Sequence, residues 1–160
     1  MKKRSKHIVK AAIIAAIYIC MGLVFGSWGF HAIQLRPAEA LNVLINYTSC
    51  APWGLFVGCV VANFTSPYGL LDIICGSVAT LTSALIGRCI KNKYLALLPS
   101  VLINAVVVSA VICYSSNIWD IYLLTMLEIG LSQAVSVYLI GIPLMFMINH
   151  SKGLKRLLED

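Results

Sequence analysis

The stretch QLRPAEALNVL, residues 34–44, places Arg36 and Glu39 three residues apart in a chain with few other charges between Ile8 and Ile148. Pro37 suits the first turn of a helix, because its missing N–H would have no partner there in any case. Arg36 is then expected just outside a helix start, and Glu39 in the first turn at the positive end of the helix dipole. Two interpretations follow: an ion pair that caps the helix, or a cation and an anion presented to a ligand.

Composition identifies the class of protein. Of 160 residues, 60% are hydrophobic and 11% are charged, and the mean hydropathy is +0.90. A soluble domain of this size carries a charge on roughly a quarter of its residues. The sequence therefore predicts an all-α, polytopic protein of the cell membrane, with a single integral-membrane domain covering residues 1–160.

The net charge of +6 comes from three basic groups, at residues 2–10, 88–93 and 152–156, each beside an apolar segment. Nucleic-acid binding would also suit a basic chain, but this distribution is typical of cytoplasmic loops of membrane proteins. Six cysteines are scattered through the apolar segments without a CxxC motif or a Cys/His cluster. We therefore expect neither a nucleic-acid partner nor a metal or other cofactor.

Six membrane-spanning helices are predicted, two of them short. The run at 8–30 would extend about 34 Å, enough for a ~30 Å bilayer and longer than a signal peptide. Segments 38–47 and 53–64 are each too short to cross alone, and they are predicted to form a hairpin that dips in and returns to the outer face. Six passes put all three basic groups and both termini in the cytoplasm. The six segments are 8–30, 38–47, 53–64, 70–86, 94–113 and 118–148.

Two features of the first segment bear on contacts. The run AAIIAA places Ala11 with Ala15, and Ala12 with Ala16, one helical turn apart. Small residues at this spacing let a second helix approach closely within a membrane. The segment that follows, 26–37, is predicted to be external, with aromatic anchors at the membrane interface. These anchors are Trp28 and Phe30, beside a solvated His31.

Polar residues within the apolar segments indicate a candidate site. Glu128 is the most informative, because an ionisable group inside a span is costly, and it is expected roughly 15 Å below the outer surface. Gln133, five residues on, faces about 140° away and is assigned to packing. A carboxylate in a first turn often caps the helix, which is the alternative for Asp72. The predicted outward-opening pocket comprises Arg36, Glu39, Asn63, Asp72, Asn104 and Glu128.

Carboxylates and carboxamides suit a ligand with clustered N–H donors, such as a purine-like ring, or an ammonium group. A purely structural polar network is the alternative. No GxxxxGK loop, HExxH motif or nucleophile–base pair occurs. The chain is therefore not expected to be an enzyme, and a transporter of this kind would need partners to supply energy.

Three stretches resemble the QueT family of substrate-binding S components of energy-coupling factor (ECF) transporters. They are RPAEAL (36–41), GLFVGCVVANFTSPYGLLDIICGSVATL (54–81), and Glu128 with the segment 131–141. The resemblance implies six helices that capture a vitamin or nucleobase from outside and dock on a membrane scaffold subunit with two ATPases. It assigns that docking to the small residues Ala11, Ala12, Ala15 and Ala16.

The family name implies a queuosine precursor, a 7-deazaguanine, as substrate. Glu128 or Glu39 would then accept from the ring N–H groups, and a second carboxylate would hold an aminomethyl cation. Alternatives are an S component for folate or thiamine, an intramembrane enzyme, or an assembly factor. Finally, Pro143 predicts a kink in the last helix, because it removes one backbone hydrogen bond.

Overall fold

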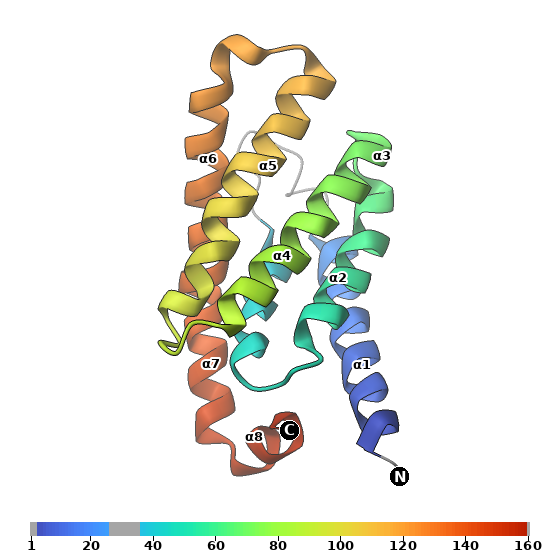
Figure 1. Ribbon diagram of the computed structural model, residues 1–160, viewed down its shortest axis with the longest axis vertical. Helices are drawn as coiled ribbons and strands as arrows, with labels where there is room; N and C mark the ends of the chain where they lie inside the picture. The colour runs from blue at the N-terminus through green and yellow to red at the C-terminus, as the bar shows by residue number, and fades with distance from the viewer. Residues whose placement is uncertain (1–2, 26–35, 160) are drawn as a thin grey trace.

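The computed structural model describes residues 3–25 and 36–159, and the elements in that part of the chain are all helical (Figure 1). In chain order they are α1 (Lys3–Val24), η2 (Pro37–Asn46), α2 (Ala51–Ala62), η3 (Asn63–Thr65), α3 (Gly69–Leu71), η4 (Asp72–Gly76), α4 (Ser77–Arg88), η5 (Leu95–Leu97), α5 (Leu98–Ser116), η6 (Trp119–Ile121), α6 (Tyr122–Ala134), η7 (Val135–Ile140), α7 (Gly141–His150) and α8 (Lys152–Leu158). The all-α prediction is confirmed for the described residues.

Each of the six predicted segments coincides with a helical stretch. Four stretches are long and apolar enough to cross a membrane, namely Arg4–Val24, Gly69–Arg88, Leu95–Ser116 and Trp119–His150, and Ala51–Thr65 is a shorter apolar helix. The first helix begins at Lys3 rather than Ile8, because lysine and arginine are good helix formers. Its predicted end at Phe30, and the external residues Trp28 and His31, lie outside the described residues. The short C-terminal helix α8 was not predicted.

The most central element is η2, which carries the opening motif. It is a 3₁₀ helix of ten residues, of which Pro37 to Ile45 are all buried. Such helices are usually only three or four residues long. Its apolar side chains form the main core together with Ile14 of α1, Leu55 of α2 and Ile148 of α7. We infer that packing on all sides, rather than its own hydrogen bonds, maintains this long 3₁₀ segment.

The surrounding helices contact one another in the order α1–α2–α4–α5–α6, and η2 contacts α1, α2, α4, η7 and α7 from within (Figure 1). Glycines allow the closest approaches. A Cβ atom on Gly58 of α2 would lie 2.7 Å from Tyr18 Cβ of α1, and one on Gly141 would lie 2.8 Å from Val43 Cγ1 of η2. Residues of η2 are thus held against α1 and against the last long helix at once.

The long helical stretch at 119–150 contains the expected irregularity. The segment η7, Val135–Ile140, has π-helical winding and ends directly before Gly141 and Pro143. Proline lacks a donor, and its ring presses on the carbonyl four residues earlier, here that of Leu139. Local π winding is a known way for a helix to accommodate such a break. The irregularity therefore lies one turn before Pro143.

Candidate functional site

The carboxylate of Glu39 is the centre of a buried hydrogen-bond network. Its side chain is 1% exposed. One oxygen accepts a hydrogen bond from the Tyr18 hydroxyl of α1, and the other accepts from Asn42 Nδ2 at 2.8 Å and from Gln133 Nε2 of α6 at 2.9 Å. Gln133 also donates to Ser100 Oγ of α5 at 3.0 Å. Three elements, α1, η2 and α6, therefore meet at this carboxylate, and α5 joins the network through Ser100.

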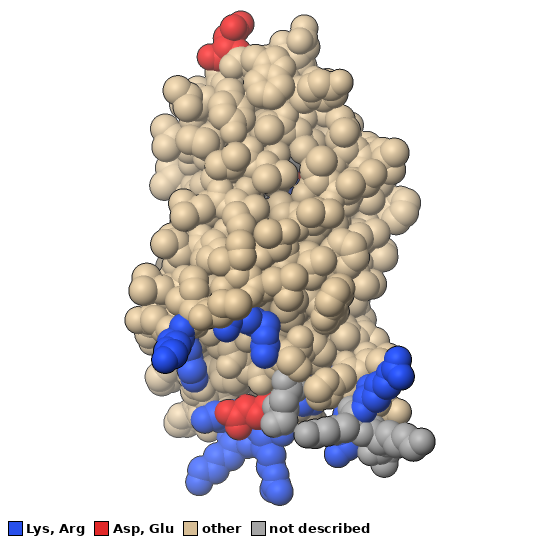
Figure 2. Space-filling model, viewed as in Figure 1, with Lys and Arg blue, Asp and Glu red and all other residues tan. Residues whose placement is uncertain are grey.

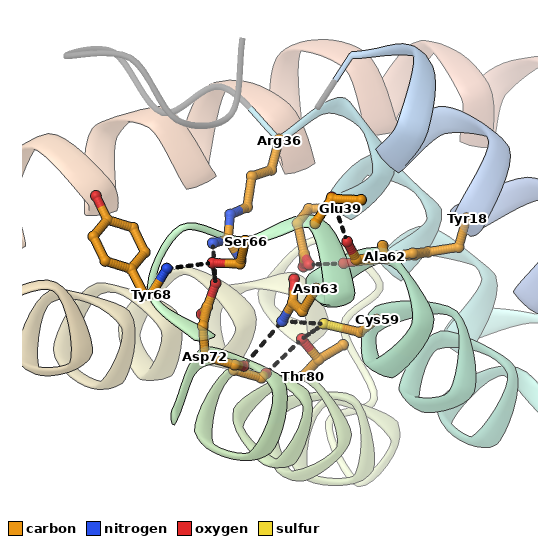
Figure 3. Close-up of polar contacts among 12 residues, drawn as sticks. Tyr18, Arg36, Glu39, Cys59, Ala62, Asn63, Ser66, Tyr68, Asp72 and Thr80 are labelled. Atoms are coloured by element: carbon orange, nitrogen blue, oxygen red, sulfur yellow. Dashed lines mark hydrogen bonds and ion pairs between the residues drawn. The ribbon is translucent and has the colours of Figure 1, made fainter. Parts of the chain in front are cut away.

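A second polar cluster surrounds Asp72 (Figure 3). Asp72 is 0% exposed, and its Oδ2 accepts from Ser66 Oγ at 2.6 Å and from Arg36 Nη2 at 3.4 Å. Asn63 Nδ2 donates to the Asp72 backbone carbonyl at 3.0 Å and to Cys59 Sγ at 3.5 Å. The Oδ1 atom of Asp72 has no hydrogen-bond partner among the described residues. This cluster joins the start of η2 to the turn before α4.

The two capping alternatives for these charges are wrong. Arg36 forms its ion pair with Asp72 and not with Glu39, so the two charges of the opening motif belong to different clusters. Asp72 does not cap the helix, because one oxygen faces Ser66 and Arg36 and the other is unpaired. In both cases the partner lies outside the first turn of the helix: Asp72 for Arg36, and Ser66 together with Arg36 for Asp72.

The prediction that Glu128 is the deeply buried carboxylate is also wrong. Its side chain is exposed on α6, and it has no ion pair with another described residue. Gln133, assigned to packing, is 4% exposed and contacts Glu39. Glu128 and Gln133 do point to different faces of α6, as predicted, but it is Gln133 and not Glu128 that faces the interior.

Asn104 and Asn63 are buried, as expected for polar groups inside a bundle, at 4% and 7% exposure. The side chain of Asn104 has no hydrogen bond to the side chain of another described residue, whereas Asn63 belongs to the Asp72 cluster. Tyr68, in the turn before Asp72, packs against the cluster of Val108 and Ile112 on α5 and Ile129 on α6. Arg36, Asn63 and Asp72 are thus in contact, Glu39 lies in the adjacent network, and Glu128 is on the neighbouring helix.

Sequence reasoning missed Tyr18 and Ser66. Tyr18 lies in an apolar run between Ile17 and Ile19, where a tyrosine is normally interpreted as a packed aromatic residue of the core. Ser66 lies in the turn TSPYG. The sequence does hold one signal for Tyr18: it lies three residues after Ala15, on the same helical face as that small residue. In the structure this face packs against Gly54 and Gly58. Nothing in the local sequence singles out Ser66.

Charge and hydropathy are distributed unevenly over the surface. Lysine and arginine gather at the end of the bundle where both termini lie, and the side of the bundle in view is otherwise nearly free of charge (Figure 2). Large apolar side chains such as Leu102, Leu123 and Leu139 are 57–70% exposed on α5, α6 and η7. An apolar exterior around buried charged groups is the architecture of an integral membrane protein with an internal polar site.

The model of the QueT transporter family matches residues 8–150, and the chain belongs to this family. A family of transporters agrees with the prediction that the chain is not an enzyme. One relative, "Queuosine precursor transporter QueT" of Lactococcus lactis subsp. cremoris (strain MG1363), is 27% identical over 95 residues. The match covers 58% of this chain and 56% of that protein, so the chain spans just over half the length of this relative. No solved structure matches the chain.

Proposed function

We propose that this chain is the S component of an ECF-type importer, and that it captures a queuosine precursor of the 7-deazaguanine class from outside the cell. The observation that carries the proposal is the family match over residues 8–150 combined with two buried carboxylates in adjacent clusters. Six membrane-spanning helices in one domain, both termini in the cytoplasm and a place in the cell membrane belong to the same proposal. The basic end of the bundle supports this orientation.

The substrate site in this proposal comprises Arg36, Glu39, Asn63, Asp72, Asn104 and Glu128. The side-chain oxygens of Asn63, Asp72, Asn104 and Glu128 offer acceptors to the N–H groups of a purine-like ring, and Arg36 and Glu39 hold the elements around them in place. The direct test is calorimetry on the purified chain with 7-aminomethyl-7-deazaguanine, with folate and thiamine as comparison ligands. Binding of the deazaguanine alone is expected. If the chain prefers folate or thiamine, the proposed substrate is wrong, but the proposed role as an S component stands.

Glu128 suits the cationic part of such a ligand, because its carboxylate is exposed and unpaired among the described residues. Glu128→Gln removes the charge with little change in size. The affinity for 7-aminomethyl-7-deazaguanine is expected to fall roughly tenfold, the effect of one charge-assisted hydrogen bond. The neutral 7-cyano analogue should lose less than about threefold. Equal losses for both ligands, measured by calorimetry, would remove Glu128 from the cation subsite.

Docking on a scaffold subunit with two ATPases is proposed to use the outer face of α1. The structure divides the alanines into two rows. Ala15 is 6% exposed and faces α2, with Ala11 in the same row, whereas Ala12 and Ala16 are exposed. Only the second row is free to meet another helix.

Ala12→Trp and Ala16→Trp are therefore expected to reduce co-purification with the scaffold and ATPases at least about tenfold, while ligand affinity of the isolated chain is retained. Ala15→Trp is the matched control on the inner row, and it should lower thermal stability instead, because the ring would separate α1 from α2. Full assembly with both outer-row variants would place the docking surface elsewhere.

A further inference from the structure

The two buried carboxylates differ in how fully their oxygens are paired. Both Glu39 oxygens accept hydrogen bonds, from Tyr18 on one side and from Asn42 and Gln133 on the other. Asp72 has one oxygen with two donors and one with none among the described residues. An ionised carboxylate has about four acceptor positions, and a buried unpaired oxygen is costly. Of the two, Asp72 therefore has unused capacity for a ligand.

The contact between Arg36 and Asp72 leaves that capacity open. It consists of a single pair of atoms, Nη2 and Oδ2, at 3.4 Å. Strong charge-assisted hydrogen bonds of this kind are about 2.7–2.9 Å long, and guanidinium–carboxylate pairs are frequently bidentate. The Arg36 side chain is 17% exposed, whereas that of Asp72 is 0% exposed. Arg36 thus covers one side of Asp72 without completing its hydrogen bonds (Figure 3).

The surroundings of Asp72 hold its backbone and place Gly76 beside its unpaired oxygen. Asn63 Nδ2 donates to the Asp72 carbonyl at 3.0 Å, which fixes the main chain. A Cβ atom on Gly76 would lie 2.9 Å from Asp72 Oδ1 and 3.0 Å from Asn63 Nδ2. Because glycine has no Cβ, Oδ1 can lie directly beside Gly76, in a place that a larger residue would block.

We propose that Asp72 binds the ring N–H and the adjacent exocyclic amino group of a guanine-like base, and that Arg36 occupies this position in the ligand-free protein. The inference rests on the proposed function, from which it takes the 7-deazaguanine ring. That edge of the ring and a guanidinium group present the same donors, two N–H groups attached to one carbon, which a carboxylate accepts side by side. The ligand pairs both oxygens, where Arg36 pairs one.

The replacement of Arg36 by the ligand at Asp72 predicts how a substitution of Arg36 changes the ligand affinity. A residue that competes with the ligand for Asp72 weakens binding, so its removal should strengthen binding. A residue that contacts the ligand directly would show the opposite effect. Glu39, whose oxygens are saturated, positions η2 and does not read the ring edge.

The test is calorimetry on the purified full-length chain with 7-deazaguanine and with 7-deazahypoxanthine, which lacks the exocyclic amino group. The wild-type chain is expected to bind the first roughly 10- to 100-fold more tightly, the value of a charge-assisted hydrogen bond. In Asp72→Asn this ratio should fall below about threefold. Asp120→Asn, the same change at an exposed acid on η6, should keep the wild-type ratio. Arg36→Gln should raise the affinity for 7-deazaguanine several-fold.

Asp72→Asn leaves Arg36 without its anion, so the double variant Arg36→Gln/Asp72→Asn, which removes both charges, is measured alongside it. Loss of the ratio in either folded variant supports the assignment. The assignment is overturned if both variants retain the wild-type ratio, or if the wild-type chain binds the two rings equally. It is also overturned if Arg36→Gln binds 7-deazaguanine more weakly, or if Asp120→Asn loses the ratio to the same extent. Failure of the wild-type chain to bind either ring overturns the proposed function itself.

Discussion

Glu39→Ala is expected to lower the free energy of unfolding by about 4 kcal/mol, because three buried donors lose their common acceptor. These donors are the Tyr18 hydroxyl, Asn42 Nδ2 and Gln133 Nε2. Each buried polar group left without a partner costs about 1–3 kcal/mol. The Tyr18 hydroxyl loses its partner, whereas Gln133 retains Ser100 and Asn42 retains the backbone carbonyl of residue 39. The measurement is the midpoint of denaturant or thermal unfolding of the purified chain without ligand.

The matched control is Glu128→Ala, since Glu128 is an exposed carboxylate on the helix that also carries Gln133. Its effect on stability should stay within about 0.5 kcal/mol. Glu39→Gln should fall between the two, because the amide keeps one acceptor but turns a donor toward Asn42 or Gln133. If Glu39 instead contacted the ligand and held no structure, changes at Glu39 would spare stability and weaken binding. Equal unfolding midpoints for Glu39→Ala and Glu128→Ala would support that expectation over the present one.

Gly58→Ala is expected to cost about 3 kcal/mol of stability, at the upper end for an overpacked interior. The added Cβ would lie 2.7 Å from Tyr18 Cβ and 3.1 Å from the Ala15 carbonyl oxygen, so α1 and α2 must move apart. That movement also withdraws the Tyr18 hydroxyl from Glu39. Both effects act in the same direction, and thermal unfolding of the ligand-free chain measures their sum.

Gly153→Ala is the control for this substitution, because a Cβ on Gly153 of α8 meets nothing within 4 Å. It should leave the unfolding midpoint unchanged or raise it slightly, since alanine is the better helix former by up to ~1 kcal/mol. A cycle with Tyr18→Phe separates the two contributions of Gly58→Ala. If displacement of Tyr18 carries part of the loss, the double variant loses less than the sum of the single variants. An unfolding midpoint for Gly58→Ala equal to that for Gly153→Ala would show that α1 and α2 tolerate the extra atom.

Hydropathy and residue spacing were sufficient for the class of protein and for the positions of the helical segments within the described residues. These properties are local. An apolar run of twenty residues predicts a long helix whatever it packs against, and a cluster of lysines beside it marks one end. The stretches 36–41 and 54–81 carried the family resemblance in the same way, as unbroken strings of residues.

The pairing of the charges was decided only by the tertiary structure. Sequence distance suggested Arg36 with Glu39, but η2 is buried on almost every side and directs these two side chains to different neighbours. Glu39 meets Tyr18 and Gln133, whereas Arg36 meets Asp72. The inward direction of α6 was equally undetermined, because apolar residues cover its entire circumference. In a membrane both the core and the outer surface of a helix are apolar, so hydropathy does not reveal which side faces the protein, and only the contacts among helices separate Gln133 from Glu128.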